Sequence, residues 1–110
     1  MSKRDNALYL SDIKTAIKKI EQYTRELTYL DFEHDNKTID AVIRNLAVIG
    51  EAVNNLAPEF RAKNKHVPWQ KIISMRNKVL HEYFGVDCGI LWQTVKEDIP
   101  TLKKELNKVK

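Results

Sequence analysis

A chain of 110 residues accommodates one domain with one modest hydrophobic core and is too short for two. Its 43% hydrophobic content, with only 3 Gly and 3 Pro, favours helices over a sheet-rich fold, and its net charge of +4 permits a polyanionic partner without requiring one. The single cysteine, Cys88, excludes an intrachain disulfide, and no apolar run approaches the roughly 18 residues of a membrane span, so we expect a cytoplasmic protein without membrane contact.

The first predicted helix runs from about Asp5 to Leu27. One face is apolar at helical spacing, and its members are Leu10, Ile13, Ile17, Ile20, Thr24 and Leu27. The helix carries no evident chemistry. The period breaks from Thr28 to Lys37, where aspartates, a histidine and an asparagine are typical of caps and turns.

The second predicted helix, from about Thr38 to Leu56, has the most strongly patterned apolar face. Gly50 interrupts that face, and we expect it to permit the close approach of a neighbouring helix. A separate polar row consists of Asp40, Arg44, Glu51 and Asn55. This row is either a solvated face with an ordinary ion pair, or it lies beside the third long helix, where Glu51 pairs with an arginine.

A short helical turn is expected from Glu59 to Lys65, after which Val67-Pro68-Trp69 opens the third long helix, ending near Phe84-Gly85. Asp87 caps the last helix, in which Pro100 predicts a kink or break between Lys96 and Ile99. The whole chain, 1–110, is therefore predicted to be a single all-α domain. Its architecture is an up-and-down bundle of four to five helices.

Polar residues interrupt the core-facing pattern of the third long helix between Met75 and Phe84. Two buried rows are predicted, one at positions 72, 76, 79 and 83 and the other at positions 73, 77, 80 and 84. Arg76 and Asn77 occupy positions where these rows call for hydrophobic residues. Burying an unpaired guanidinium is costly, so Arg76 is expected to have a partner or to line a polar cleft.

Arg76 and His81 together suit the cleavage of a phosphodiester. Arginine binds phosphate through two hydrogen bonds, and histidine exchanges a proton near neutral pH. In RNA the neighbouring 2′-hydroxyl can be the nucleophile, so no metal ion is needed, and no metal-ligand cluster is evident. The two side chains lie about 140° apart on one ideal helix, so we expect a bent helix end or, preferably, two chains pooling their residues across a two-fold axis.

The run Arg76-Asn77-Lys78-Val79-Leu80-His81-Glu82-Tyr83 resembles the Arg–Asn–three–His–x–Tyr signature of the HEPN superfamily, specifically its HepT-like toxins. Three further segments of the chain are similar to the same family: Asp40 to Ala52, Val67-Pro68-Trp69 and Asp98-Ile99-Pro100. The resemblance implies a helical bundle that forms a homodimer with a composite site in the cleft between the chains.

The resemblance further implies the toxin of a toxin–antitoxin pair that acts as a metal-independent endoribonuclease without a cofactor. Arg76 would hold the scissile phosphate and His81 would be the general acid or base, with Asn77, Glu51 and Arg44 in support. The partner would be a minimal nucleotidyltransferase antitoxin that transfers AMP from ATP to Tyr83. Phosphate and adenosine added beside Arg76 would then block RNA.

Two other interpretations of the same residues remain open. The chain could be a helical binding module without catalytic activity, which docks a nucleotidyltransferase or presents its substrate. It could also be a purely structural helical dimer in which Arg76 and Glu51 form a buried ion pair. The second of these predicts a sharp loss of thermal stability in Arg76→Ala.

Overall fold

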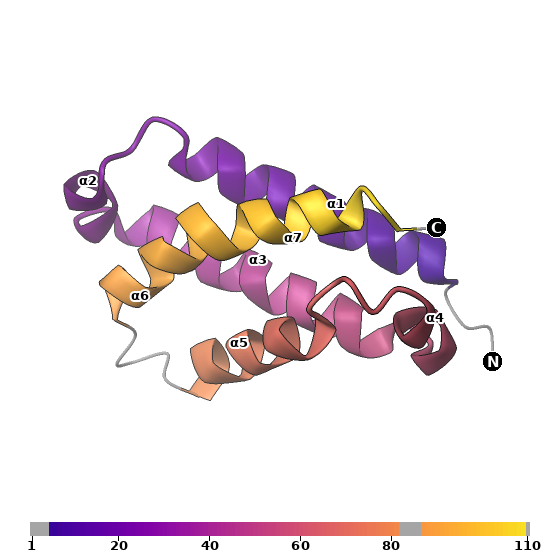
Figure 1. Ribbon diagram of the computed structural model, residues 1–110. Coiled ribbons are helices and arrows are strands. Elements are labelled where there is room, and N and C mark those ends of the chain that lie inside the picture. The colour runs from indigo at the N-terminus through magenta and orange to yellow at the C-terminus, as the bar shows by residue number, and fades with distance from the viewer. Residues whose placement is uncertain (1–4, 82–86, 110) are drawn as a thin grey trace.

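Every regular element that the structure describes is a helix (Figure 1). The computed structural model describes residues 5–81 and 87–109, the side chains of residues 79–81 excepted. Its elements are α1 (Asn6–Thr24), α2 (Tyr29–Glu33), α3 (Asn36–Asn55), α4 (Pro58–Lys63), α5 (Trp69–His81), α6 (Cys88–Gln93), the π-helical segment η2 (Thr94–Asp98) and α7 (Ile99–Leu106). In Figure 1 the long helices α1, α3 and α5 and the continuous rod α6–η2–α7 run alternately up and down, which confirms the predicted all-α bundle.

Aspartate side chains cap the N-termini of three helices. Asp5, Asp35 and Asp87 each accept a backbone N–H from the first turn of α1, α3 and α6, at 3.0, 3.0 and 2.7 Å. Thr28 and Asp31 form a capping box that starts α2, a five-residue helix that the sequence pattern predicted only as caps and turns. Capping by Asp31, Asp35 and Asp87 was therefore predicted correctly, whereas the cap at Asp5 and the short helix α2 were missed.

Helix α3 lies at the centre of the bundle and packs along its length against α1 and α5. Its residues Val42, Leu46, Ile49 and Val53 follow one helical row and are fully buried. Most of the predicted face of α1 is buried too, namely Ile13, Ile17, Ile20 and Thr24, whereas Leu10 and Leu27 at its ends are partly buried. The fold therefore depends on α3, which supplies core side chains to helices on both sides.

Pro100 alters the last helix without ending it. Proline has no N–H to bond the carbonyl of Lys96, and the segment before it adopts π geometry. Ile99 donates its N–H to the carbonyl of Thr94, five residues back. The irregularity predicted before Pro100 is therefore present as a π turn, and the helix continues beyond it. Its residues Ile99, Leu102 and Leu106 remain in the core.

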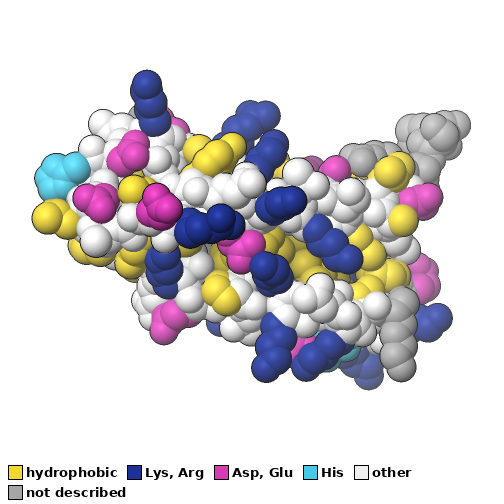
Figure 2. Space-filling model, turned by 90° about the horizontal axis from the view of Figure 1, so that it is seen from above, with side chains coloured by type: hydrophobic (Ala, Val, Ile, Leu, Met, Phe, Trp, Pro, Cys, Tyr) yellow, Lys and Arg dark blue, Asp and Glu magenta, His cyan; other side chains and the backbone are white. Residues whose placement is uncertain are grey.

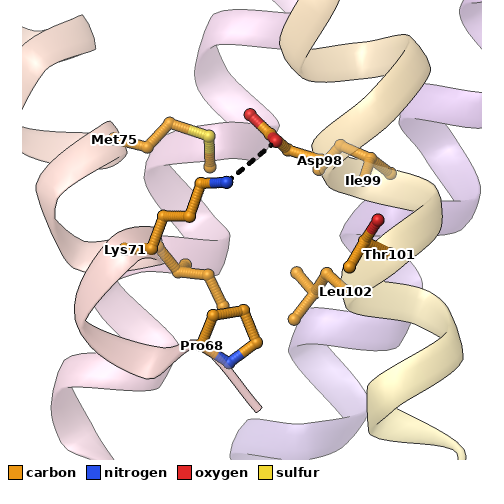
Figure 3. Close-up of a pocket in the computed structure, with 8 residues that line it drawn as sticks. Pro68, Lys71, Met75, Asp98, Ile99, Thr101 and Leu102 are labelled. Atoms are coloured by element: carbon orange, nitrogen blue, oxygen red, sulfur yellow. Dashed lines mark ion pairs between the residues drawn. The ribbon is translucent and has the colours of Figure 1, made fainter.

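The seam between α5 and the last helix holds a small apolar cavity of about 60 Å³ (Figure 3). Ile72 and Met75 of α5 face Ile99 and Leu102 across it. Figure 3 shows the ammonium group of Lys71 directed to Asp98 at the rim, where Nζ and Oδ1 are 3.3 Å apart. This exposed pair is worth at most about 1 kcal/mol, so the seam is held mainly by its apolar contacts.

Gly50 lies where α3 crosses α5. A Cβ atom added to Gly50 would overlap the Cβ and Cγ atoms of Arg76. The prediction that Gly50 permits the close approach of a neighbouring helix is thereby confirmed. The neighbour is α5, and the atoms that approach belong to the stem of Arg76.

We predict that Gly50→Ala lowers the free energy of unfolding by about 1 kcal/mol or more. Alanine favours a helix by about 1 kcal/mol over glycine, but overpacking a close contact costs about 1–3 kcal/mol, and the overlapping atoms next to the α5 backbone cannot easily move. Urea denaturation measures the change. Ser74→Ala, on the exposed side of α5, is the control and should stay within about 0.5 kcal/mol of wild type. A Gly50→Ala protein as stable as wild type would contradict this account.

Candidate functional site

Arg76 is the most buried charged side chain of the predicted site that the structure describes. Its stem lies on Gly50, and only 18% of its side chain is exposed. The terminal NH2 group donates to Oε2 of Glu51 at 3.1 Å, and that carboxylate is 64% exposed. The predicted pairing of Glu51 with an arginine is confirmed. Because the carboxylate is open to water, the pair lies at the rim of the bundle and not in its core.

One nitrogen of Arg76 has no partner. Its Nε atom is shielded from solvent and makes no hydrogen bond within the part of the chain that the structure describes. A buried N–H without an acceptor costs roughly 1–3 kcal/mol, and in a native protein it calls for an explanation. A guanidinium has five N–H donors in a planar fork, so Arg76 retains donors that an incoming anion can use.

The Arg76 side chain opens into a groove of about 440 Å³ that three helices build together. The polar residues that line it are Tyr9 and Asp12 of α1, Arg44, Glu51 and Asn55 of α3, and Arg76 of α5. The two arginines therefore share one groove with two carboxylates. A strand with negative phosphates would meet Arg44, exposed on α3, beside the half-buried Arg76.

The polar row of α3 is a solvated face, and its residues Arg44, Glu51 and Asn55 also line this groove. Asp40, Arg44, Glu51 and Asn55 are all exposed. Asn55 donates its Nδ2 to the backbone carbonyl of Glu51 at 2.9 Å, one helical turn back. The two interpretations of the row are thus compatible, because a face that meets water also supplies the partner of Arg76.

Helix α1 takes part in the groove, contrary to the expectation that it carries no chemistry. Tyr9 is half-buried at the margin of the α1 apolar stripe, and Asp12 lies one turn further on. Nothing in the local sequence distinguishes these two residues from an ordinary helix margin. Only the packing of α1 beside α3 brings them to Arg44 and Arg76.

Asn77 does not lie on a buried row, so that expectation is wrong. It is exposed, whereas Ile72, Ile73 and the stem of Arg76 face the neighbouring helices. Gly50 of α3 lies against position 76, and position 77, which is about 100° further around α5, faces outward. His81 is the last residue of α5. Its side chain lies outside the described residues, as does the whole of Tyr83.

Two further properties bear on the chemistry of this surface. Within residues 5–81 and 87–109, no group of three or more His, Cys, Asp or Glu side chains is placed to hold a metal ion. No helix in these ranges combines the length and apolar character that a bilayer crossing requires.

The sequence matches known proteins along nearly its whole length. The profile of a family described as "Ribonuclease HepT-like" matches residues 13–109. The "Probable ribonuclease HepT" of Thermococcus cleftensis is 48% identical over 98% of both chains. A "Putative RNase" of Methanocaldococcus jannaschii is 41% identical over 96% of this chain and 97% of its own. A longer protein of that organism, "Gamma-glutamylcyclotransferase and putative RNase", is 45% identical over 97% of this chain but only 48% of its own length. No solved structure gives a significant match.

A double-mutant cycle tests whether the Arg76–Glu51 pair is a structural element. We predict that the cycle of Glu51→Gln and Arg76→Met gives a coupling energy below about 1 kcal/mol, because the carboxylate is exposed. Methionine retains an apolar stem over Gly50, so the cycle isolates the charge. Urea denaturation of the four proteins supplies the free energies. A coupling near 3 kcal/mol or above, as found when a buried pair is broken, would favour the structural helical dimer instead.

Proposed function

The chain belongs to the ribonuclease HepT-like family of the HEPN superfamily, and from this membership and the geometry of Arg76 we propose that it is a metal-independent endoribonuclease. The observation that carries the proposal is the guanidinium of Arg76. It is held by Glu51 on one side, has a buried Nε without a partner, and faces a groove of about 440 Å³. A phosphate of RNA accepts hydrogen bonds from the terminal N–H groups of this guanidinium, which lie at the rim, whereas the enclosed Nε stays out of its reach.

The reaction we propose is attack by the 2′-hydroxyl on the adjacent phosphate. His81 takes the proton of the 2′-hydroxyl, the bond from O2′ to phosphorus forms, and the bond from phosphorus to O5′ breaks. A second histidine in its protonated form gives a proton to the leaving O5′. Arg76 stabilises the charge on the phosphate oxygens as the bonds change. The products are a 2′,3′-cyclic phosphate and a 5′-hydroxyl.

Two copies of the chain complete the proposed site. Arg76 and His81 are five residues apart on α5, which places them about 140° apart on an ideal helix. A homodimer with its α5 helices near a two-fold axis brings one chain's arginine to the other chain's histidine. The same arrangement supplies one histidine as base and the second as acid. Asn77, Glu51 and Arg44 then act as supporting residues of the cleft.

We further propose that the protein is the toxin of a toxin–antitoxin pair. Its antitoxin would be a minimal nucleotidyltransferase that transfers AMP from ATP to Tyr83. The motif places Tyr83 two residues after His81. An added phosphate there would compete with RNA for the guanidinium of Arg76, and the adenosine would fill the space of a nucleotide.

We predict that the purified protein cleaves single-stranded RNA in excess EDTA and that His81→Ala lowers the rate by about 100-fold or more, since general acid–base catalysis contributes about 10²–10⁴-fold. Gel analysis of a labelled RNA measures the rate, and the new 5′-hydroxyl ends identify the chemistry. Lys104→Ala, an exposed residue of α7, is the control and should cleave as wild type does. Equal cleavage by wild type and His81→Ala would reject the assignment. No cleavage by either, with stable binding of a nucleotidyltransferase, would favour the non-catalytic binding module.

We predict that co-expression with a nucleotidyltransferase encoded beside the gene adds an adenylyl-sized mass to the protein. The increment should be absent in Tyr83→Phe, which lacks the acceptor hydroxyl, and present in Tyr23→Phe, which removes an exposed tyrosine of α1. Mass spectrometry of the intact protein makes the comparison, and the modified protein should no longer cleave RNA. An increment that persists in Tyr83→Phe would show that another residue is the acceptor.

A further inference from the structure

A second arginine has the same unsatisfied nitrogen as Arg76. Within the described residues, two side-chain nitrogen or oxygen atoms are shielded from solvent and lack a hydrogen bond, and they are the Nε atoms of Arg76 and Arg61. Arg61 belongs to α4, and no residue of α4 lines the groove described above. The cost of an unpaired buried N–H applies equally to both residues.

Arg61 lines a second groove, of about 450 Å³, between α4 and the start of α5. Figure 1 shows the connection that leads from α4 to the first turn of α5. Three cationic residues line this groove, Arg61, Lys65 and Lys71, and the described lining residues include no carboxylate. The Arg76 groove, in contrast, is lined by two arginines and two carboxylates. The α4–α5 groove is therefore the more strongly positive of the two.

The backbone around this groove is held in place by Trp69. Its ring lies in the core with 7% exposure, and its Nε1 donates to the carbonyl oxygens of Arg61 and Asn64, at 3.1 and 3.0 Å. These carbonyls at the end of α4 are thus occupied and do not present free negative dipoles to a ligand. The bonds also fix the turn that carries Lys65 against the start of α5.

Lysines alone do not distinguish this groove from the rest of the surface. Figure 2 shows Lys and Arg side chains spread widely over one face of the molecule. Lys14 and Lys18 of α1, for example, line an open groove of about 400 Å³, and neither is among the buried, unpaired groups. Lys71 also lies at the rim of the cavity between α5 and the last helix, where its ammonium group pairs with Asp98 (Figure 3). The distinguishing residue is Arg61, with Lys65 as the second cation.

We propose that the α4–α5 groove binds two phosphates of the RNA strand away from the reacting centre, one at Arg61 and one at Lys65. This inference rests on the proposed ribonuclease activity. Arginine and lysine are the side chains that bind backbone phosphates without reading sequence. At about 1.5 Å and 100° per residue, position 71 lies about 7.5 Å along α5 from Arg76 and about 140° around it. A strand that contacts both grooves therefore passes partly around α5 as well as along it.

The salt dependence of RNA binding tests the proposal. Each phosphate contact on a single strand contributes about 0.7 to the slope of log affinity against log salt concentration. In a His81→Ala background, which leaves the strand intact, Arg61→Ala/Lys65→Ala should reduce the magnitude of the slope by about 1.4 for a labelled single-stranded RNA. Lys14→Ala/Lys18→Ala removes the same charge from α1 and should leave the slope near that of the background protein.

Thermal unfolding verifies that each variant is folded. Should Arg61→Ala/Lys65→Ala fail to fold, Lys65→Gln replaces it, since Lys65 is exposed, and should reduce the slope by about 0.7. A slope unchanged by the groove variants, or changed equally by the Lys14 and Lys18 variant, overturns the inference. Cleavage of the same RNA by the wild-type protein is measured in parallel. If wild type does not cleave, the ribonuclease proposal fails by itself, while the slopes still decide whether the groove binds the strand.

Discussion

The contact between Gly50 of α3 and the stem of Arg76 on α5 is the constraint on which the candidate site depends. It brings two helices close enough that no Cβ atom fits between them. The same contact covers the arginine's stem and leaves its charged end at the rim, next to Glu51. A long cationic side chain can do both, because its methylene groups tolerate burial and its guanidinium does not. The side chain of Arg76 therefore takes part both in the packing of α5 on α3 and in the ion pair with Glu51.

The groove next to Arg76 is a property of the bundle and not of any one helix. Residues of α1, α3 and α5 that are far apart in the sequence line it together. The core side of these helices is filled by apolar rows, above all that of α3, so the polar residues are left at the margins where helices meet. Such margins bring charged side chains close together, and Arg44 and Glu51 remain exposed to water there.

Helix α5 has a different role in each of its turns. Its first turn closes the α4–α5 groove and carries Trp69, which bonds the end of α4. Its middle presents Arg76, and its last residue is His81. Ile72 and Ile73 pack into the core between these points. Cations spaced along one helix suit an extended, negatively charged strand, for which the spacing of contacts matters more than the identity of bases.

The sequence by itself was sufficient for the helical class, the four long helices, most of the aspartate caps and the irregularity before Pro100, because these follow from local periodicity and local hydrogen bonding. It also indicated that Gly50 lies at a close contact and that Glu51 pairs with an arginine. Tertiary structure alone decided that Asn77 is exposed, that Tyr9 and Asp12 join the groove, and that the Nε atoms of Arg61 and Arg76 are enclosed. These three outcomes depend on the distance and the rotation between neighbouring helices, which the helical repeat of a sequence does not specify. A residue at the margin of an apolar stripe faces either water or a neighbouring helix, according to how closely that helix packs.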